Sequence, residues 1–175
     1  MSVASLLSMG GKKVVRRPNV WQAMINELTS CNATYLKLYD INKLYQQVLQ
    51  ALHLASKEIA TEEKWLTIPN MGHIVAIVYR VVLVTLSIKG CSTFLPLTGL
   101  VPHQSDHKFL CILHVNNNHW VQVHMSSGFP MPNSNPQWRH HCIHNALSWE
   151  LPYLDRMSRF LEILMEQNTP RSEEF

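Results

Sequence analysis

The stretch FLCILHVNNNHWVQVHM, residues 109–125, contains two strand-like runs with a turn between them. Residues 109–115 are mostly apolar, and residues 120–125 alternate apolar with polar side chains, as strands with one buried face do. The three asparagines at 116–118 separate the runs, and asparagine tolerates the left-handed backbone angles of tight turns. The pattern therefore predicts a β-hairpin over residues 109–125, with His119 directly after its turn.

Two earlier runs extend this hairpin into a sheet. Residues 81–86, VVLVTL, are mostly β-branched and apolar. The side chains that would point to each of the two faces of a sheet are therefore both apolar, which predicts a strand covered on both faces. Residues 92–97 are a further strand candidate, stopped by Pro96, and Lys89-Gly90 reads as the turn between the two. We therefore expect a small mixed sheet within residues 81–125.

Apolar residues at helical spacing surround this region on both sides. Helices are predicted over Ser2–Met9, after Pro18, from a cap at Asn32 through an apolar stripe ending at Leu52, from Pro69 to Val78, and from Leu154 to Leu164. Residues 56–64 and 128–138 read as loops, the second because of its prolines and asparagines. The order of elements predicts an α+β fold in which helices flank a small mixed sheet.

The length and composition indicate one globular domain. The chain has 175 residues, of which 46% are hydrophobic and 15% charged, enough to form a real core. We expect the domain over residues 1–166 and a disordered tail over 167–175. No apolar run is long enough to cross a membrane, and the basic residues near the start follow the apolar stretch, unlike in a secretory signal. These patterns predict a cytoplasmic or nuclear protein without a membrane partner.

A formal charge of +3 says little about partners. The basic cluster Lys12, Lys13, Arg16 and Arg17 could touch a phosphate backbone. No aromatic residues are interleaved with it, as they are in proteins that bind single strands, so a solvated loop or helix edge is the favoured interpretation. We do not expect nucleic acid as the partner.

Neither metal nor cofactor chemistry is predicted. Four cysteines are widely spaced without a C-x-x-C pair, and the run His140-His141-Cys142-x-His144 has zinc-ligand types whose adjacent members cannot easily converge on one ion. The carboxylate pairs Glu62-Glu63 and Glu173-Glu174 are adjacent residues that point apart, which gives no support for a two-carboxylate hydrolase.

His119 is the candidate catalytic residue. A neutral imidazole at the start of a strand is suited to take a proton from a thiol and return it, as a general base does. A surface histidine in a turn, beside the core residue Trp120, explains the same pattern. The residues alone leave both interpretations open.

Longer motifs resemble a known family. The strings KWLTIPNMGHIVAIVYRVVLVTLS, STFLPL and NNNHWVQVHM, followed by SGFPMPNSNPQWRHHC and SWELPYLDRMSRF, are similar to the ovarian-tumour (OTU) family of cysteine proteases. The similarity is greatest to a plant subgroup of otubain-like and transposase-associated proteins, and it covers roughly residues 2–162. SVASLLSMG resembles the segment that directly follows the nucleophile motif of the family.

The resemblance implies a papain-like core and a deubiquitinase activity, with ubiquitin or a ubiquitin-like modifier as the partner. In such an enzyme His119 is the base for a cysteine at a helix N-terminus, where the dipole lowers the thiol pKa. Trp65 and Gly72-His73 fall in the framework around the site. The nucleophile motif, of the type Asp-Gly-x-Cys, precedes the SVASLLSMG segment, so we expect a domain truncated at its N-terminus and inactive as written.

Two further departures concern the site. Many family members carry Asp or Asn two positions after the histidine, where this chain has Val121; Asn116, Asn117 or Asn118 could orient the imidazole instead. Replacement of the nucleophile by another cysteine is not expected, since Cys31 falls at a helix end and Cys111 in mid-strand. Two alternatives remain: a ubiquitin-binding pseudoenzyme, and a transposon-derived interaction protein associated with nucleic acid.

Overall fold

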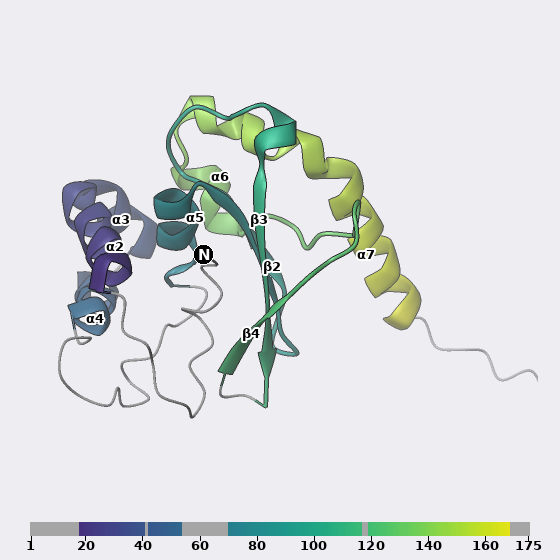
Figure 1. Ribbon diagram of the computed structural model, residues 1–175, viewed down its shortest axis with the longest axis horizontal. Helices are drawn as coiled ribbons and strands as arrows, with labels where there is room; N and C mark the ends of the chain where they lie inside the picture. The colour runs from purple at the N-terminus through teal and green to yellow at the C-terminus, as the bar shows by residue number, and fades with distance from the viewer. Residues whose placement is uncertain (1–17, 41, 54–69, 117–118, 169–175) are drawn as a thin grey trace, which may run out of the picture.

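Four strands form one mixed sheet in the computed structural model, which describes residues 18–40, 42–53, 70–116 and 119–168. The strands are β1 (Val81–Leu86), β2 (Ser92–Phe94), β3 (Lys108–Val115) and β4 (His119–Val123), in the spatial order β2-β1-β3-β4. β1 and β3 are parallel, and the two outer pairs are antiparallel. Helices lie on both sides of the sheet (Figure 1), so the predicted α+β class with a small mixed sheet is confirmed.

The predicted hairpin is present. β3 and β4 pair antiparallel, with Cys111 opposite Val123 and Val115 opposite His119. The strand predicted over residues 92–97 is shorter, because β2 ends at Phe94 and the next residues leave the ladder before Pro96. Leu95 and Leu97 are nevertheless fully buried. The apolar pattern of residues 92–97 therefore predicts correctly that these residues are in the core, although it overestimates the length of the strand.

Three helices precede the sheet: α2 (Pro18–Ser30), α3 (Asn32–Tyr39) and α4 (Asn42–His53). The prediction of one helix from a cap at Asn32 to Leu52 is wrong. Asn32 is the first helical residue, and Asp40 ends α3 in the left-handed conformation (φ 52°), with its N–H donated to the Lys37 carbonyl oxygen. Aspartate accepts this conformation more readily than most residues, and the chain turns there before α4.

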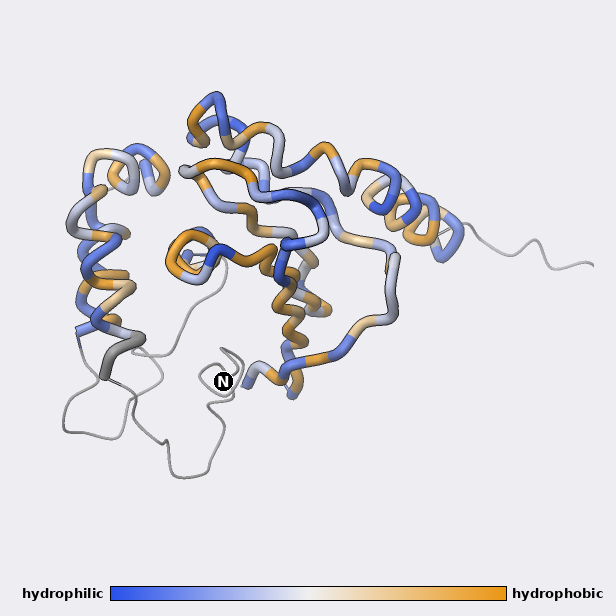
Figure 2. The backbone as a smooth tube through the Cα atoms, turned by 45° about the horizontal axis from the view of Figure 1, so that its top comes forward, coloured by the Kyte–Doolittle hydropathy of each residue, from blue (hydrophilic) through white to orange (hydrophobic). Residues whose placement is uncertain are grey.

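Helix α5 (Gly72–Tyr79) leads directly into β1 and lies at the centre of the molecule. Its residues Gly72 to Ala76 are buried, and Arg80 ends it with a left-handed backbone (φ 49°). Figure 2 shows how hydrophobic segments gather in this central region, while hydrophobic and hydrophilic residues alternate along the outer helices.

The C-terminal third contains α6 (Pro136–His141), the 3-10 turns η3 (His144–Trp149) and η4 (Leu151–Tyr153), and α7 (Leu154–Asn168); a shorter 3-10 turn, η2 (Gln104–Asp106), precedes β3. The loop predicted over residues 128–138 is wrong at its end, since Pro136 starts α6. The Asn135 side chain caps that helix by accepting a hydrogen bond from the Gln137 N–H, and Trp138 is fully buried.

The outer edge of β2 is covered by the segment that precedes α6. The Thr93 hydroxyl donates to the Pro132 carbonyl at 2.7 Å, and the Thr93 N–H donates to the Asn133 carbonyl at 2.9 Å. The Trp138 indole N–H donates to the Pro96 carbonyl at 3.0 Å. These bonds join the C-terminal third to the sheet and satisfy polar groups that would otherwise be buried without partners.

Some sequence-based predictions fall outside the described residues: the helix over Ser2–Met9, the basic cluster, the loop over 56–64, Trp65, and the tail beyond Asn168. Within the described ranges, no helix combines the length and apolar character needed to cross a bilayer.

The close approach of α5 to β2 gives a first testable prediction. A Cβ at Gly72 would lie 2.5 Å from the Phe94 ring, which is fully buried and cannot move aside cheaply. We expect Gly72→Ala to lower the free energy of unfolding by about 1–3 kcal/mol in urea denaturation, despite the better helix propensity of alanine. Adding Phe94→Leu should recover part of the loss; an unchanged midpoint for Gly72→Ala would contradict the packing described.

The buried His73 gives a second prediction. Its Nδ1 lies 3.3 Å from the Leu95 carbonyl oxygen and its Nε2 3.4 Å from Asn135 Oδ1. Burial lowers the pKa of His73 to about 4, although both oxygens favour the charged ring; His141 lowers it further. Because the unfolded state, with a pKa near 6.5, binds a proton more readily, stability is complete above about pH 6.5 and is lost as the pH falls toward 4.

Denaturation at pH 7 and pH 4.5 should therefore differ by about 2 kcal/mol from this group. His73→Gln should reduce that difference, whereas His124→Gln, which changes an exposed histidine, should retain it. An equal pH dependence in both variants would show that His73 does not titrate as described.

Candidate functional site

His119 is held at a defined place by the hairpin. It is the first residue of β4 and lies opposite Val115, half-buried, after a turn in which Asn116 has a left-handed backbone (φ 51°). Residues opposite each other in an antiparallel pair share one face, so His119 lies on the face that carries Val115, Leu113 and Val121. A histidine fixed by backbone pairing is suited to accept a proton from a group brought to that end of the sheet.

The neighbours of His119 bear on how its ring is oriented. Val121 shares its face and offers no hydrogen bond to the imidazole. Asn116 is exposed in the turn, and Asn117 and Asn118 lie outside the described residues. On the opposite face, Trp120 stacks on His114 with ring centroids 4.6 Å apart. The tryptophan is therefore a packing residue, as its apolar pattern indicated.

The four cysteines all lie in described residues, and none of the strand cysteines is close to His119. Cys111 is four residues along β3 from Val115, the partner of His119, which is about 13 Å at the strand rise. Cys111 is buried, and burial raises the pKa of its thiol to about 11. Cys91 precedes β2, on the opposite edge of the sheet from β4, and its thiol donates to the Ser87 carbonyl.

The two helical cysteines are no better placed. Cys142 is the C-terminal cap of α6, and the next residue, Ile143, donates its N–H to the Leu97 carbonyl. Leu97 follows Phe94, which is the end of β2 farther from His119, so Cys142 lies away from the histidine. Cys31 lies between α2 and α3, in the helical layer that Figure 1 shows beyond α5. The sequence predicts Cys31 at the end of a helix, and in the structure Cys31 also directly precedes α3. A helix N-terminus lowers a thiol pKa, but burial and the nearby Glu27 raise the pKa of Cys31.

The histidine-rich run is part of α6 and η3 and does not form a ligand cluster. His141 Nε2 lies 3.2 Å from the Gln137 side-chain oxygen, and Arg139 donates to Glu150 through Nε at 3.0 Å. Glu150 is buried and also accepts a hydrogen bond from Ser134. Across residues 18–40, 42–53, 70–116 and 119–168, no three His, Cys, Asp or Glu side chains are grouped to hold a metal ion.

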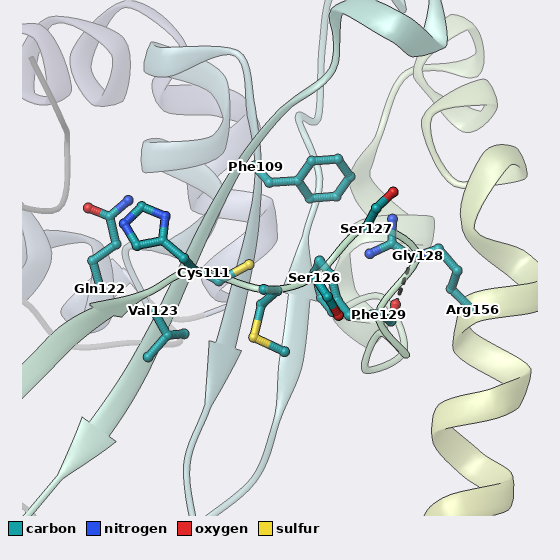
Figure 3. Close-up of a pocket in the computed structure, with 11 residues that line it drawn as sticks. Phe109, Cys111, Gln122, Val123, Ser126, Ser127, Gly128, Phe129 and Arg156 are labelled. Atoms are coloured by element: carbon teal, nitrogen blue, oxygen red, sulfur yellow. Dashed lines mark hydrogen bonds between the residues drawn. The ribbon is translucent and has the colours of Figure 1, made fainter.

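A pocket of about 290 Å³ lies at the other end of β4 and was not predicted (Figure 3). Its apolar lining comes from β3, β4, Met125 and Phe129, and Arg156 of α7 also lines it. In the sequence Arg156 is one charged residue of an amphipathic helix, and nothing in its spacing connects it with a hairpin more than 30 residues earlier. Only the three-dimensional arrangement brings these residues together.

No protein-family model, curated protein or solved structure matches the chain.

The thiol environments give a testable prediction. Cys91 is exposed, whereas Cys111 is buried with a pKa of about 11, so Cys111 carries very little thiolate at pH 7.5. With excess iodoacetamide, followed by peptide mass spectrometry, we expect Cys91 to be alkylated first and Cys111 last. All four should react at similar rates in denaturant; rapid alkylation of Cys111 in the native protein would contradict its assigned burial.

Proposed function

We propose that this chain is an OTU-like cysteine protease domain of the deubiquitinase type, with a papain-like core and His119 as its general base. The observation that carries the proposal is the position of His119, the first residue of a hairpin strand that leaves a tight asparagine turn. The motif NNNHWVQVHM, which resembles the histidine segment of that family, covers this same turn and strand.

The framework around the base supports the same interpretation. Gly72 and His73 begin α5, where glycine allows close contact with Phe94 and the histidine ring packs edge-on against it at 5.1 Å. These residues hold α5 against the sheet and are far from solvent, as framework residues are. They have no catalytic role in the proposal.

The domain in this form binds its modifier without hydrolysing it, because none of the four cysteines is positioned to give His119 a nucleophile. Cys111 is buried about 13 Å away along the hairpin, and Cys91 is at the opposite sheet edge. Loss of a nucleophile removes most of the rate enhancement in a cysteine or serine protease. The partner is ubiquitin or a ubiquitin-like modifier, recognised without chemistry.

The first test uses the ¹⁵N-labelled chain titrated with ubiquitin, together with a fluorogenic amide of the ubiquitin C-terminus. We expect localised shifts that include the hairpin, and no hydrolysis. The absence of shifts at high ubiquitin concentration would refute the proposed partner. Hydrolysis that survives mutation of all four cysteines would refute a cysteine mechanism.

A second test concerns the base itself. The N-terminus of the endogenous protein should be mapped by terminal peptide analysis, and any longer form that carries a further cysteine should be assayed. In such a form, His119→Gln should lower kcat/KM about 10²–10⁴-fold, the range expected for a lost general base. The matched variant His124→Gln should leave kcat/KM within about twofold, since His124 lies just beyond the same strand; equal effects of the two variants would reject His119 as the base.

A further inference from the structure

The guanidinium of Arg156 is held among aromatic rings beside the pocket at the end of β4. Its central carbon lies 4.2 Å from the centroid of the Phe129 ring, 5.1 Å from that of Phe109 and 5.5 Å from that of Tyr153. Its Nε donates to the Phe129 carbonyl oxygen at 2.8 Å. These contacts fix the position of the group and leave its two terminal nitrogens for other partners.

One of those nitrogens, Nη2, is buried and has no hydrogen-bond partner within the described structure. No carboxylate of the described residues pairs with Arg156; the titratable groups that act on it are Tyr153 and Cys111, and Arg159 contributes a like charge. A buried donor without a partner is energetically unfavourable, and more so when it is charged. Among the described residues, no side chain supplies an anion to balance this positive charge.

The pocket beside Arg156 has both apolar and polar lining. Phe109, Cys111, Val123 and Phe129 supply apolar surface, and the exposed serines Ser126 and Ser127 add hydroxyl groups (Figure 3). Phe109 keeps 39% of its surface exposed. A bare inorganic anion would leave that surface uncovered, whereas an organic acid covers it.

We propose that this pocket binds a carboxylate attached to a single apolar group, with Arg156 as the residue that recognises the carboxylate. The planar fork of arginine matches the two oxygens of a carboxylate, and the apolar lining accepts the attached side chain. A volume of about 290 Å³ is at the small end of ligand sites and suits one residue-sized group. Arg156 is itself one of the residues that line the pocket.

Two sources share this chemistry: a free small acid and the C-terminal residue of a peptide. The site is separate from His119, because Val123 and His119 are the two ends of β4, about 13 Å apart. The proposal therefore does not depend on the proposed protease function.

The experiment titrates the ¹⁵N-labelled full chain with N-acetylphenylalanine and with its amide, which has nearly the same size but no charge. The free acid should shift the backbone signals of residues 122–129 and the Nε–H of Arg156, and the amide should bind at least tenfold more weakly. Equal binding of acid and amide, or no shifts from either, would overturn the proposal. Matching shifts from inorganic phosphate alone would also overturn it, since they would indicate a simple anion site.

Peptides ending in phenylalanine, as free acid and as C-terminal amide, distinguish the two sources. Tighter binding of the peptide acid than of N-acetylphenylalanine identifies a peptide terminus, and equal binding identifies a free acid; both support the site. Binding of peptide acid and peptide amide with one affinity would contradict it.

Variants complete the test. Arg156→Lys keeps the charge but loses the fork, and should weaken acid binding about tenfold. Arg159→Gln, three residues further along α7, is the matched control and should change binding less than twofold. Because Arg156→Lys also disturbs ring packing, Ser127→Phe tests the site without changing Arg156: a bulky ring at the exposed rim should block binding. Retained binding in both Arg156→Lys and Ser127→Phe would refute the proposed site.

Discussion

The parallel pairing of β1 with β3 is the constraint on which the rest of the fold depends. β1 is the second strand in the sheet and is buried on both faces, so both of its alternating residue sets need cover. The register places Val82 beside Phe109 and Val84 beside Cys111 on the face where Phe109 meets Tyr153. The other face carries Val81 and Leu83, which require the helices of the N-terminal side (Figure 1). One strand thus determines that helices lie on both sides of the sheet.

A parallel pair cannot be closed by a tight turn, and here the chain must pass β1 on its way from β2 to β3. His107, which directly precedes β3, holds the end of this connection. Its Nε2 faces the Pro102 carbonyl oxygen at 3.1 Å and must donate, which leaves Nδ1 to accept the hydrogen bond from the Tyr153 hydroxyl. The ring also stacks on Trp149 at 4.6 Å. The connection is therefore joined to the turns that begin α7, and this junction sets the place of Arg156.

The sequence predicted those parts of the fold that depend on local pattern. The hairpin, β1 and the helix before it follow from periodicity and turn residues close in the chain. The predictions that failed have two different causes, one distant in the chain and one local. The loop predicted over residues 128–138 overlaps the start of α6, because prolines and asparagines dominate residues 130–136. The helix forms there with the Trp138 indole N–H bonded to the Pro96 carbonyl, 42 residues away. The break at Asp40 interrupts an otherwise continuous apolar stripe. At the sites, His119 was identifiable from its turn, whereas Arg156 acquires its surroundings only when α7 packs on β3.

The two candidate sites are linked by the geometry of one strand. His119, Val121 and Val123 occupy alternate positions of β4, so they share a face, and the same face of β3 runs from Val115 to Phe109. His119 stands at one end of this face and the Arg156 pocket at the other, with apolar residues between them. The two ends of β4 are about 13 Å apart, so a ligand in the pocket lies about that far from His119. If an extended peptide occupies the pocket by its C-terminus and follows β4, its preceding residues run toward His119. The edge strand would then determine both where such a chain is held and which part of it approaches the histidine.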